Sequence, residues 1–335
     1  MLDPAIRTRR CRVGEAAGAA VELDVLEAGE AGAPLVLLAH GFPEAAYSWR
    51  HQLTSIAAAG FHVIAPNQRG YATSSRPEAV TDYGITALSG DLVALIDDAG
   101  AAQATIVGHD WGALIVWEMA RLHPERVNGV VGVSVPYSPA PAPPVSLMKM
   151  RFGDEFFYIV YFQPVGPAER ELEADVRRTM QSMLYGVSGS GLPDALASAQ
   201  PRPAAGTGFL DTVPTPPPPP FTGPEGIWLT EDDLAAYVEA FEASGFFGPV
   251  SYYRNLDSNW SITNSLPHPS MPSMFIGGEL DPVLSMSPGA LDRMPELLPD
   301  FRGSVLIPGA GHWTQQETPA AFDAALLPFL QTVTA

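Results

Sequence analysis

Asp110 is the residue whose type and setting most directly predict chemistry. It stands in the stretch 105–112, Thr-Ile-Val-Gly-His-Asp-Trp-Gly, which is typical of a short buried strand, a tight turn and the start of a helix. Gly108 and Gly112 lie two residues to either side of it. A carboxylate exposed at such a turn can attack a saturated carbon and form an alkyl ester, which predicts an epoxide or alkyl halide as substrate. A second interpretation stays open, because an aspartate there can also cap the helix.

Asp281 and His312 are two further candidates, and each follows a short apolar run. Residues 272–278 and 303–308 are predicted strands, followed by Gly-Glu-Leu-Asp-Pro and Gly-Ala-Gly-His-Trp. In a doubly wound sheet the ligand lies outside the carboxyl ends of the strands, so both side chains are expected near Asp110. Alone, each could be an ordinary turn residue. Together the three supply a nucleophile, an acid and a base, which predicts a catalytic triad.

The sheet that must position these residues is indicated by a series of apolar runs. Residues 34–39, 61–66 and 127–135 are typical of parallel strands buried on both faces. Residues 21–27 alternate between apolar and acidic side chains, which predicts a half-buried antiparallel strand at the edge.

Helices alternate with these strands. Residues 85–96 carry apolar side chains at helical spacing, and Gly100 supplies the stop. A C-terminal helix is predicted to begin at Thr318 and Pro319, with Pro328 expected to kink or end it. This order predicts an α/β fold with a right-handed, mostly parallel sheet flanked by helices.

The alternation stops at residue 136. Residues 136–267 hold aromatic-rich helical segments, which predicts a helical cap inserted between a first core part, 1–135, and a second, 268–335. The cap includes a proline-rich stretch, 201–224, with five consecutive prolines at 216–220. These prolines cannot join a helix or a central strand, so an exposed extended linker is expected. A binding site for a proline-recognising module is the alternative.

Two loops after predicted strands stand out. The first, His40-Gly-Phe-Pro-Glu44, is a sharp turn whose Phe42–Pro43 bond is a candidate for the cis form, since X-Pro bonds are the ones that readily adopt it. The second, residues 67–77, is rich in turn residues and contains Arg69, which we expect to hold loop carbonyls rather than take part in catalysis.

Composition excludes several classes of partner. The formal net charge is −19, which argues against nucleic acid and anionic membranes because phosphate binding requires clustered Lys and Arg. A single cysteine, Cys11, excludes an internal disulfide framework and predicts a cytoplasmic location. No apolar run is long enough to span a membrane. The seven histidines lack the spacing of metal ligands, so no metal is predicted.

Several stretches resemble those of soluble epoxide hydrolases of the α/β-hydrolase fold. They are His40-Gly-Phe-Pro-Glu44, Gly108-His-Asp-Trp-Gly112, Tyr158-Ile-Val-Tyr-Phe-Gln163, Gly248-Pro-Val-Ser-Tyr-Tyr-Arg-Asn255, Glu279-Leu-Asp-Pro282 and Gly311-His-Trp-Thr-Gln315. The resemblance covers nearly the whole chain. It implies the α/β-hydrolase fold, whose nucleophile elbow holds the nucleophile at a strained strand-to-helix turn, with acid and base following in the chain order found here.

The resemblance also implies a role for each candidate. Asp110 would be the nucleophile and His312 the base, held by Asp281. Tyr158 and Tyr253 would donate to the epoxide oxygen from the cap. Neighbouring tyrosines leave other assignments open; they are Tyr161, Tyr185 and Tyr252.

The remaining implied positions support the nucleophile. The backbone N–H groups of Phe42 and Trp111 would form the oxyanion hole. Residues that shape these motifs are His40, Gly41, Pro43, Gly108 and Gly112. The expected reaction converts a small apolar epoxide and water into a vicinal diol without a cofactor.

Two alternatives remain. Haloalkane and haloacetate dehalogenases also use an aspartate and a histidine, but they generally place Asn at the position of Phe42 or Arg at that of Trp111. A ligand receptor with an idle hydrolase fold is the alternative of another class. The sequence leaves the identity of the epoxide and a homodimer open.

Overall fold

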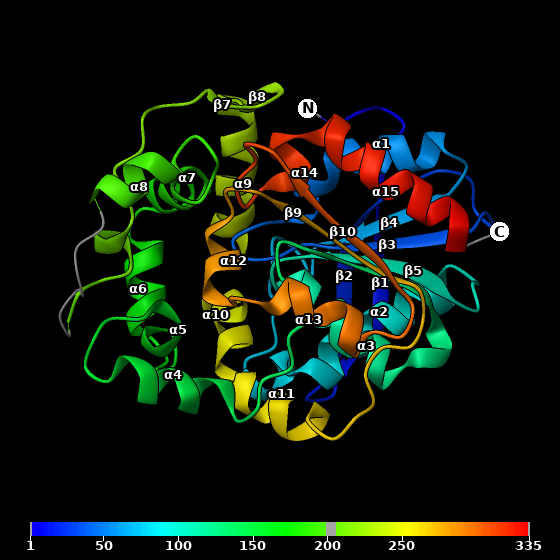
Figure 1. Cartoon of the computed structure of the whole chain (residues 1–335), viewed down its shortest axis with the longest axis horizontal. Coiled ribbons are helices and arrows are strands. Elements are labelled where there is room, and N and C mark those ends of the chain that lie inside the picture. The colour runs from blue at the N-terminus through cyan, green and yellow to red at the C-terminus, as the bar shows by residue number, and fades with distance from the viewer. Residues whose placement is uncertain (1, 199–205, 334–335) are drawn as a thin grey trace.

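The computed structural model describes residues 2–198 and 206–333 (Figure 1). One eight-stranded sheet has the order β1-β2-β4-β3-β5-β6-β9-β10, and a separate two-stranded sheet joins β7 to β8. The strands are β1 (Arg7–Ala16), β2 (Ala19–Ala28), β3 (Leu35–Ala39), β4 (His62–Pro66), β5 (Ala104–His109), β6 (Val127–Val133), β7 (Phe221–Gly223), β8 (Gly226–Leu229), β9 (Ser273–Gly278) and β10 (Phe301–Ile307). In the large sheet the neighbouring strands β4, β3, β5, β6, β9 and β10 all pair in parallel, which confirms the predicted mostly parallel sheet.

The first strand was not predicted, and it changes the position of the second. β1 pairs antiparallel with β2, and β2 pairs antiparallel with β4, so β2 lies inside the sheet and its prediction as an edge strand is wrong. The arginines of β1 form ion pairs with acidic side chains of β2, among them Arg9 with Glu27 and Arg10 with Glu22.

Helices cover both faces of the sheet (Figure 1). They are α1 (Arg50–Ala58), α2 (Ile85–Asp98), α3 (Trp111–Leu122), α4 (Pro144–Phe152), α5 (Tyr158–Tyr161), α6 (Pro167–Glu173), α7 (Val176–Gly186), α8 (Leu192–Ser198), α9 (Glu231–Ser244), α10 (Phe247–Arg254), α11 (Leu256–Thr263), α12 (Pro282–Met286), α13 (Ala290–Leu297), α14 (Thr314–Glu317) and α15 (Pro319–Val333). Short 3-10 turns are η1 (Ala46–Trp49), η2 (Val80–Tyr83), η3 (Pro124–Arg126) and η4 (Leu210–Thr212). One core lies under α1 and α15. A larger core lies under α2 and α3 and extends into the helices between β6 and β9.

Pro328 was expected to kink or end the C-terminal helix, and it does not end it. α15 continues through Pro328 to Val333, although a proline within a helix lacks one backbone N–H. The predicted inward face is buried as expected, with Phe322, Leu326 and Leu330 fully covered. Burial of this apolar face offsets the missing hydrogen bond.

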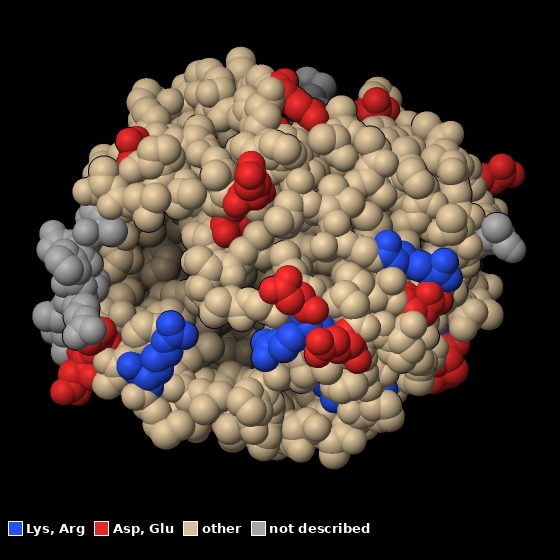
Figure 2. Space-filling model, in the orientation of Figure 1, with Lys and Arg blue, Asp and Glu red and all other residues tan. Residues whose placement is uncertain are grey.

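Helices α4 to α11 all lie between β6 and β9 in the chain, and they form the left part of the molecule in Figure 1. Figure 2 shows a hollow in the surface on the left side of the molecule, in the part that these helices form. The same view shows Lys and Arg side chains that are isolated from one another on this face, with no basic patch on it. Among the described residues, no helix has the length and apolar character needed to cross a lipid bilayer.

The proline-rich stretch is only partly described, since residues 201–205 lie outside the described residues. Residues 216–220 have no helix or strand and are exposed or half-buried, as expected for an extended linker. The carbonyl of Pro217 accepts a hydrogen bond from Gln181 Nε2 at 2.6 Å, which fixes the linker to α7. The stretch ends in β7, a strand that its composition did not predict.

Candidate active site

Asp110 lies at the turn between β5 and α3. Its φ of 52° and ψ of −115° are rare for a residue with a side chain. Close packing holds this turn, because a Cβ on Gly108 would overlap the carbonyl of Gly112, and one on Gly112 would overlap the carbonyl of Ala39. The Asp110 side chain makes no capping hydrogen bond to α3, so the capping interpretation is wrong. Backbone strain held in this way is typical of functional sites.

The loop after β3 delivers a backbone N–H to this carboxylate. The N–H of Phe42 donates to Asp110 Oδ1 at 2.8 Å. Gly41 makes this approach possible, since a Cβ there would overlap the Asp110 side chain. The bond from Phe42 to Pro43 is cis, as predicted.

His40 supports the loop from within. Its Nε2 accepts the backbone N–H of Gln68 at 3.1 Å, so its Nδ1–H donates to the carbonyl of Gly41 at 2.9 Å. Burial lowers the pKa of His40 to about 4. A neutral histidine with both ring nitrogens engaged holds the loop and is not available for proton transfer.

His312 lies between Asp110 and Asp281. Its Nδ1 is 3.0 Å and 3.1 Å from the two carboxylate oxygens of Asp281, and its Nε2 is 3.6 Å from Asp110 Oδ2. Burial disfavours the imidazolium, but Asp281 and Asp110 outweigh burial and raise the pKa of His312 well above its usual value. Burial likewise opposes the charge on Asp110, but His312, His109 and the N–H of Phe42 outweigh it and lower the pKa of Asp110. The free site therefore favours an imidazolium between two carboxylates.

Tyr158 in α5 and Tyr253 in α10 approach the same region from the inserted helices. Their ring centroids are 5.9 Å apart, and the Tyr253 ring lies 5.0 Å from that of Trp111 and 5.6 Å from that of Phe42. Burial, together with the charge of Asp110, raises the pKa of both phenols, which keeps them protonated as hydrogen-bond donors.

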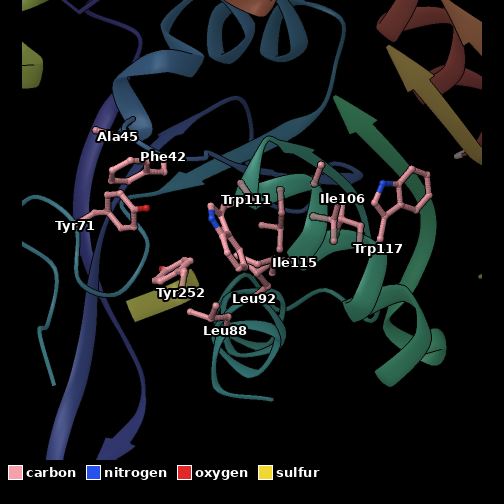
Figure 3. Close-up of a cluster of buried hydrophobic side chains, with 14 of the residues drawn as sticks. Phe42, Ala45, Tyr71, Leu88, Leu92, Ile106, Trp111, Ile115, Trp117 and Tyr252 are labelled. Carbon is pink, nitrogen blue, oxygen red and sulfur yellow. The ribbon is translucent and has the colours of Figure 1, made fainter. Parts of the chain in front are cut away.

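The neighbouring tyrosines have other partners. Tyr252 donates to the carbonyl of Arg69 at 2.9 Å, and it lies in the buried cluster of Figure 3 beside Trp111 and Leu88. Tyr161 donates to Glu171 Oε2 and Tyr185 to Asp194 Oδ2, each at 2.7 Å. Their hydroxyl groups are therefore engaged away from Asp110, which favours Tyr158 and Tyr253 as the pair.

Arg69 has the structural role expected of it. Its guanidinium binds both oxygens of Asp91 and donates to the carbonyl of Asp82 at 2.8 Å. Both side chains of the Arg69–Asp91 pair are almost fully buried. The pair joins the loop after β4 to α2, behind the site.

The sequence did not predict a buried network behind the nucleophile. His109 Nε2–H donates to the carbonyl of His312 at 2.8 Å, and its Nδ1 lies 2.6 Å from Glu44 Oε2. Glu44 also accepts from the side-chain amides of Gln315 and Gln316. Burial would raise the pKa of Glu44, but His109, the backbone N–H of Gly41 and His40 outweigh burial and lower it, which favours the ionised carboxylate. The signal in the sequence was an ionisable residue at the end of an apolar strand, next to Asp110.

Among residues 2–198 and 206–333, no group of His, Cys, Asp or Glu side chains could hold a metal ion. The groups that lie together at the candidate site are the carboxylate of Asp110, the imidazole of His312 and the phenols of Tyr158 and Tyr253. A carboxylate facing the cap on one side, with its other oxygen bound by a backbone N–H, is suited to attack carbon and to stabilise charge on the bound oxygen.

The chain is similar to known proteins over most of its length. Residues 34–319 match the family described as alpha/beta hydrolase fold. The chain is 48% identical to Epoxide hydrolase A of Mycobacterium tuberculosis, over 92% of this chain and 94% of that protein. It is 38% identical to Epoxide hydrolase B of the same organism, over 89% and 91% of the two chains.

Solved structures agree as well. The crystal structure of Epoxide Hydrolase A from Mycobacterium thermoresistibile superposes with a TM-score of 0.87 at 44% identity, covering 97% of this chain and 98% of that one. An epoxide hydrolase from an endophytic Streptomyces superposes with a TM-score of 0.88 at 37% identity, covering 99% and 97%. The chain therefore belongs to the alpha/beta hydrolase fold family and, within it, to the epoxide hydrolases.

Proposed function

We propose that this enzyme converts a small apolar epoxide into a vicinal diol through a covalent ester on Asp110. The observation that carries the proposal is the position of Asp110, which makes no cap bond and lies 3.6 Å from His312 Nε2, beneath two phenols. Aromatic side chains line the approach from the cap, including Phe42, Phe162 and Phe209 around the two tyrosines. This lining suits an apolar substrate.

Ring opening assigns different roles to the two oxygens of Asp110. Oδ1 is bound by the N–H of Phe42, so Oδ2 is the oxygen free to attack a ring carbon. The new C–O bond forms as the C–O bond of the epoxide breaks, and the developing alkoxide takes a proton from Tyr158 or Tyr253. The product of this step is a hydroxyalkyl ester on Asp110.

Ester formation then changes the charge of His312. The alkylated Asp110 carries no negative charge, so one of the two groups that raise the pKa of His312 is lost. His312 gives up its proton, and this proton passes to the tyrosine that was ionised in ring opening, which becomes neutral again. As a neutral base, His312 is then ready to accept a proton from water.

Hydrolysis closes the cycle. His312, held by Asp281, takes one proton from water, and the hydroxide attacks the ester carbonyl. The negative charge develops on Oδ1, at the N–H groups of Phe42 and Trp111; the latter begins α3 and has no partner within that helix. The acyl–oxygen bond breaks, the second proton of the water passes to the departing alkoxide, and Asp110 is again a carboxylate.

The test is one turnover of excess enzyme with styrene oxide in ¹⁸O-labelled water. We expect ¹⁸O in the peptide that bears Asp110 and unlabelled oxygen in the first diol released. His312→Gln should accumulate the ester, and Asp110→Ala should form none. Labelled diol with no label in Asp110 would mean direct attack by water and would overturn the ester mechanism.

A dehalogenase is the weaker candidate. The indole of Trp111, which could bind a halide, packs edge-on against the ring of Tyr253 with the centroids 5.0 Å apart. Chloride release from a haloalkane at the rate of epoxide turnover would reverse this preference. An idle receptor would bind an apolar ligand without turnover.

We also propose that residues 136–267 form the cap and that 1–135 and 268–335 form the core. Helices α4 to α11 fall within the proposed cap. A cytoplasmic location, the homodimer and the absence of a cofactor remain predictions.

A further inference from the structure

Glu317 is a buried carboxylate that the proposed mechanism does not use. It lies at the end of α14 and is 1% exposed. Its Oε2 accepts the backbone N–H groups of Gly189 at 2.9 Å and Gly311 at 3.1 Å, and its Oε1 accepts that of Trp313 at 3.1 Å. Two of these three donors are the residues on either side of His312.

The third donor belongs to the turn after α7, within the proposed cap. In the same place the N–H of His312 donates to the carbonyl of Val187 at 2.9 Å. The two segments are in backbone contact, because a Cβ on Gly311 would overlap Gly189 and a Cβ on Gly189 would overlap the carbonyl of Gly309. Glu317 therefore joins the loop of the base to the cap.

The charge of Glu317 matters for this junction. An ionised carboxylate accepts several N–H groups strongly, whereas a protonated one turns an O–H toward a donor. Burial outweighs the three N–H groups and the charge of His312, and it raises the pKa of Glu317 to about 7. His312 is a titratable group that acts on this carboxylate, and the cap turn brings the backbone N–H of Gly189 to it.

We propose that Glu317 is a positioning residue, which as a carboxylate holds the His312 loop against the cap turn and so sets the rate of ester hydrolysis. This inference rests on the proposed function. Asp110 and the two tyrosines do not contact Glu317, so ring opening does not depend on it.

The first experiment follows the ester on Asp110 in single turnovers of Glu317→Gln with styrene oxide. Ester formation should match the parent, and ester hydrolysis should slow by about tenfold or more, as expected when a catalytic base is displaced. The matched control is Glu225→Gln, because Glu225 is exposed and its carboxylate also accepts two backbone N–H groups, those of Ala320 and Ala321 at 2.9 Å. Hydrolysis at the parent rate in Glu317→Gln would overturn the proposal.

The second experiment measures the pH dependence of ester hydrolysis in the parent enzyme. This measurement tests the proposal even if Glu317→Gln fails to fold. The rate should fall with decreasing pH as two protons bind, one on His312 and, below about pH 7, one on Glu317. Glu317→Gln should lose one of these protons from the profile. Gly189→Ala separates the cap turn from the His312 loop without removing the charge of Glu317. It should slow ester hydrolysis and leave both protons in the pH profile.

If the rate of ester hydrolysis in the parent enzyme falls at low pH as expected for the binding of one proton, the proposed role of Glu317 is wrong. Failure to detect any ester, in the parent and in all variants, would instead refute the proposed function. The two failures are therefore distinguishable.

Discussion

Replacing Asp281 by Asn removes the charge that faces His312 and leaves the local shape unchanged. Asp281 has a second role, since its Oδ1 accepts the N–H of Val283 at 2.9 Å and caps α12. Asn caps helices as well as Asp does, so the variant should fold. Any change in turnover then reports the charge of Asp281.

The magnitude follows from the geometry of the pair. Asp281 and His312 are both buried, and Nδ1 lies 3.0 Å from Oδ2. With about 4 Å between the centres of charge, an effective dielectric constant of about 20 gives an attraction of about 4 kcal/mol. The imidazolium forms only partly in the transition state of hydrolysis, so about 2–4 kcal/mol is lost. This corresponds to a slowing of roughly 30- to 1,000-fold.

The assay is a rapid-quench single turnover, with mass spectrometry of the peptide that carries Asp110. Ester hydrolysis in Asp281→Asn should slow by the calculated factor, while ester formation changes much less, because Asp110 and both tyrosines are intact. Asp292→Asn on α13, an exposed aspartate, is the control. The reasoning fails if Asp281→Asn is folded and hydrolyses its ester as fast as the control.

The direction of the pH dependence is a further check on the same variant. Asp281 raises the pKa of His312, so its removal favours the neutral base. The acid limb of ester hydrolysis should therefore move to lower pH, although the plateau is lower. A limb that moves to higher pH would contradict the assigned role of Asp281.

Three further predictions follow from single contacts. Tyr253→Phe should slow ester formation by about 100-fold, since one donor to the alkoxide is lost, and leave ester hydrolysis unchanged in the same quench assay. Asp91→Ala should lower the free energy of unfolding by about 3–5 kcal/mol in urea, because it leaves Arg69 buried without its partner. Gly112→Ala should abolish ester formation and lower the melting temperature, since its Cβ would overlap the carbonyl of Ala39.

The sequence predicted the parallel part of the sheet well because its strands are continuous apolar runs. It failed at β1, whose arginines find their partners on β2 only when the two strands pair. Of the two outcomes expected at Pro328, the end of the helix does not occur, because burial of the apolar face of α15 outweighs the lost hydrogen bond. In both places a tertiary contact overrides the local preference.

Some residues of the candidate site could be predicted from the sequence, and others could not. Asp110, Asp281 and His312 were predicted to converge because each follows a parallel strand, and the structure places Asp110 and Asp281 on either side of His312. The two tyrosines depended on the family resemblance, since spacing alone does not distinguish Tyr253 from Tyr252. Glu317 was not predicted, because its role depends on backbone N–H groups from distant segments.

Hydrogen bonds to backbone carbonyls join the segments that carry the two tyrosines. Gln163 Nε2 donates to the carbonyl of Ile159 beside Tyr158 at 2.8 Å and to that of Tyr253 at 3.1 Å. Arg254 adds bonds to the carbonyls of Phe162, Gln163 and Pro164. The spacing of the two phenols is therefore determined within the inserted helices.

Their distance from Asp110 depends instead on how these helices sit on the sheet. Part of that contact is the junction at Val187 and Gly189, which also holds the loop of His312. The helix of Tyr253 is also held by contacts away from this junction, because Tyr252 donates to the carbonyl of Arg69 at 2.9 Å and Gly248 lies against Gly70. The loop of the base and the acid Tyr253 are therefore held by different contacts, so ester hydrolysis can be slowed at the junction while ring opening is kept.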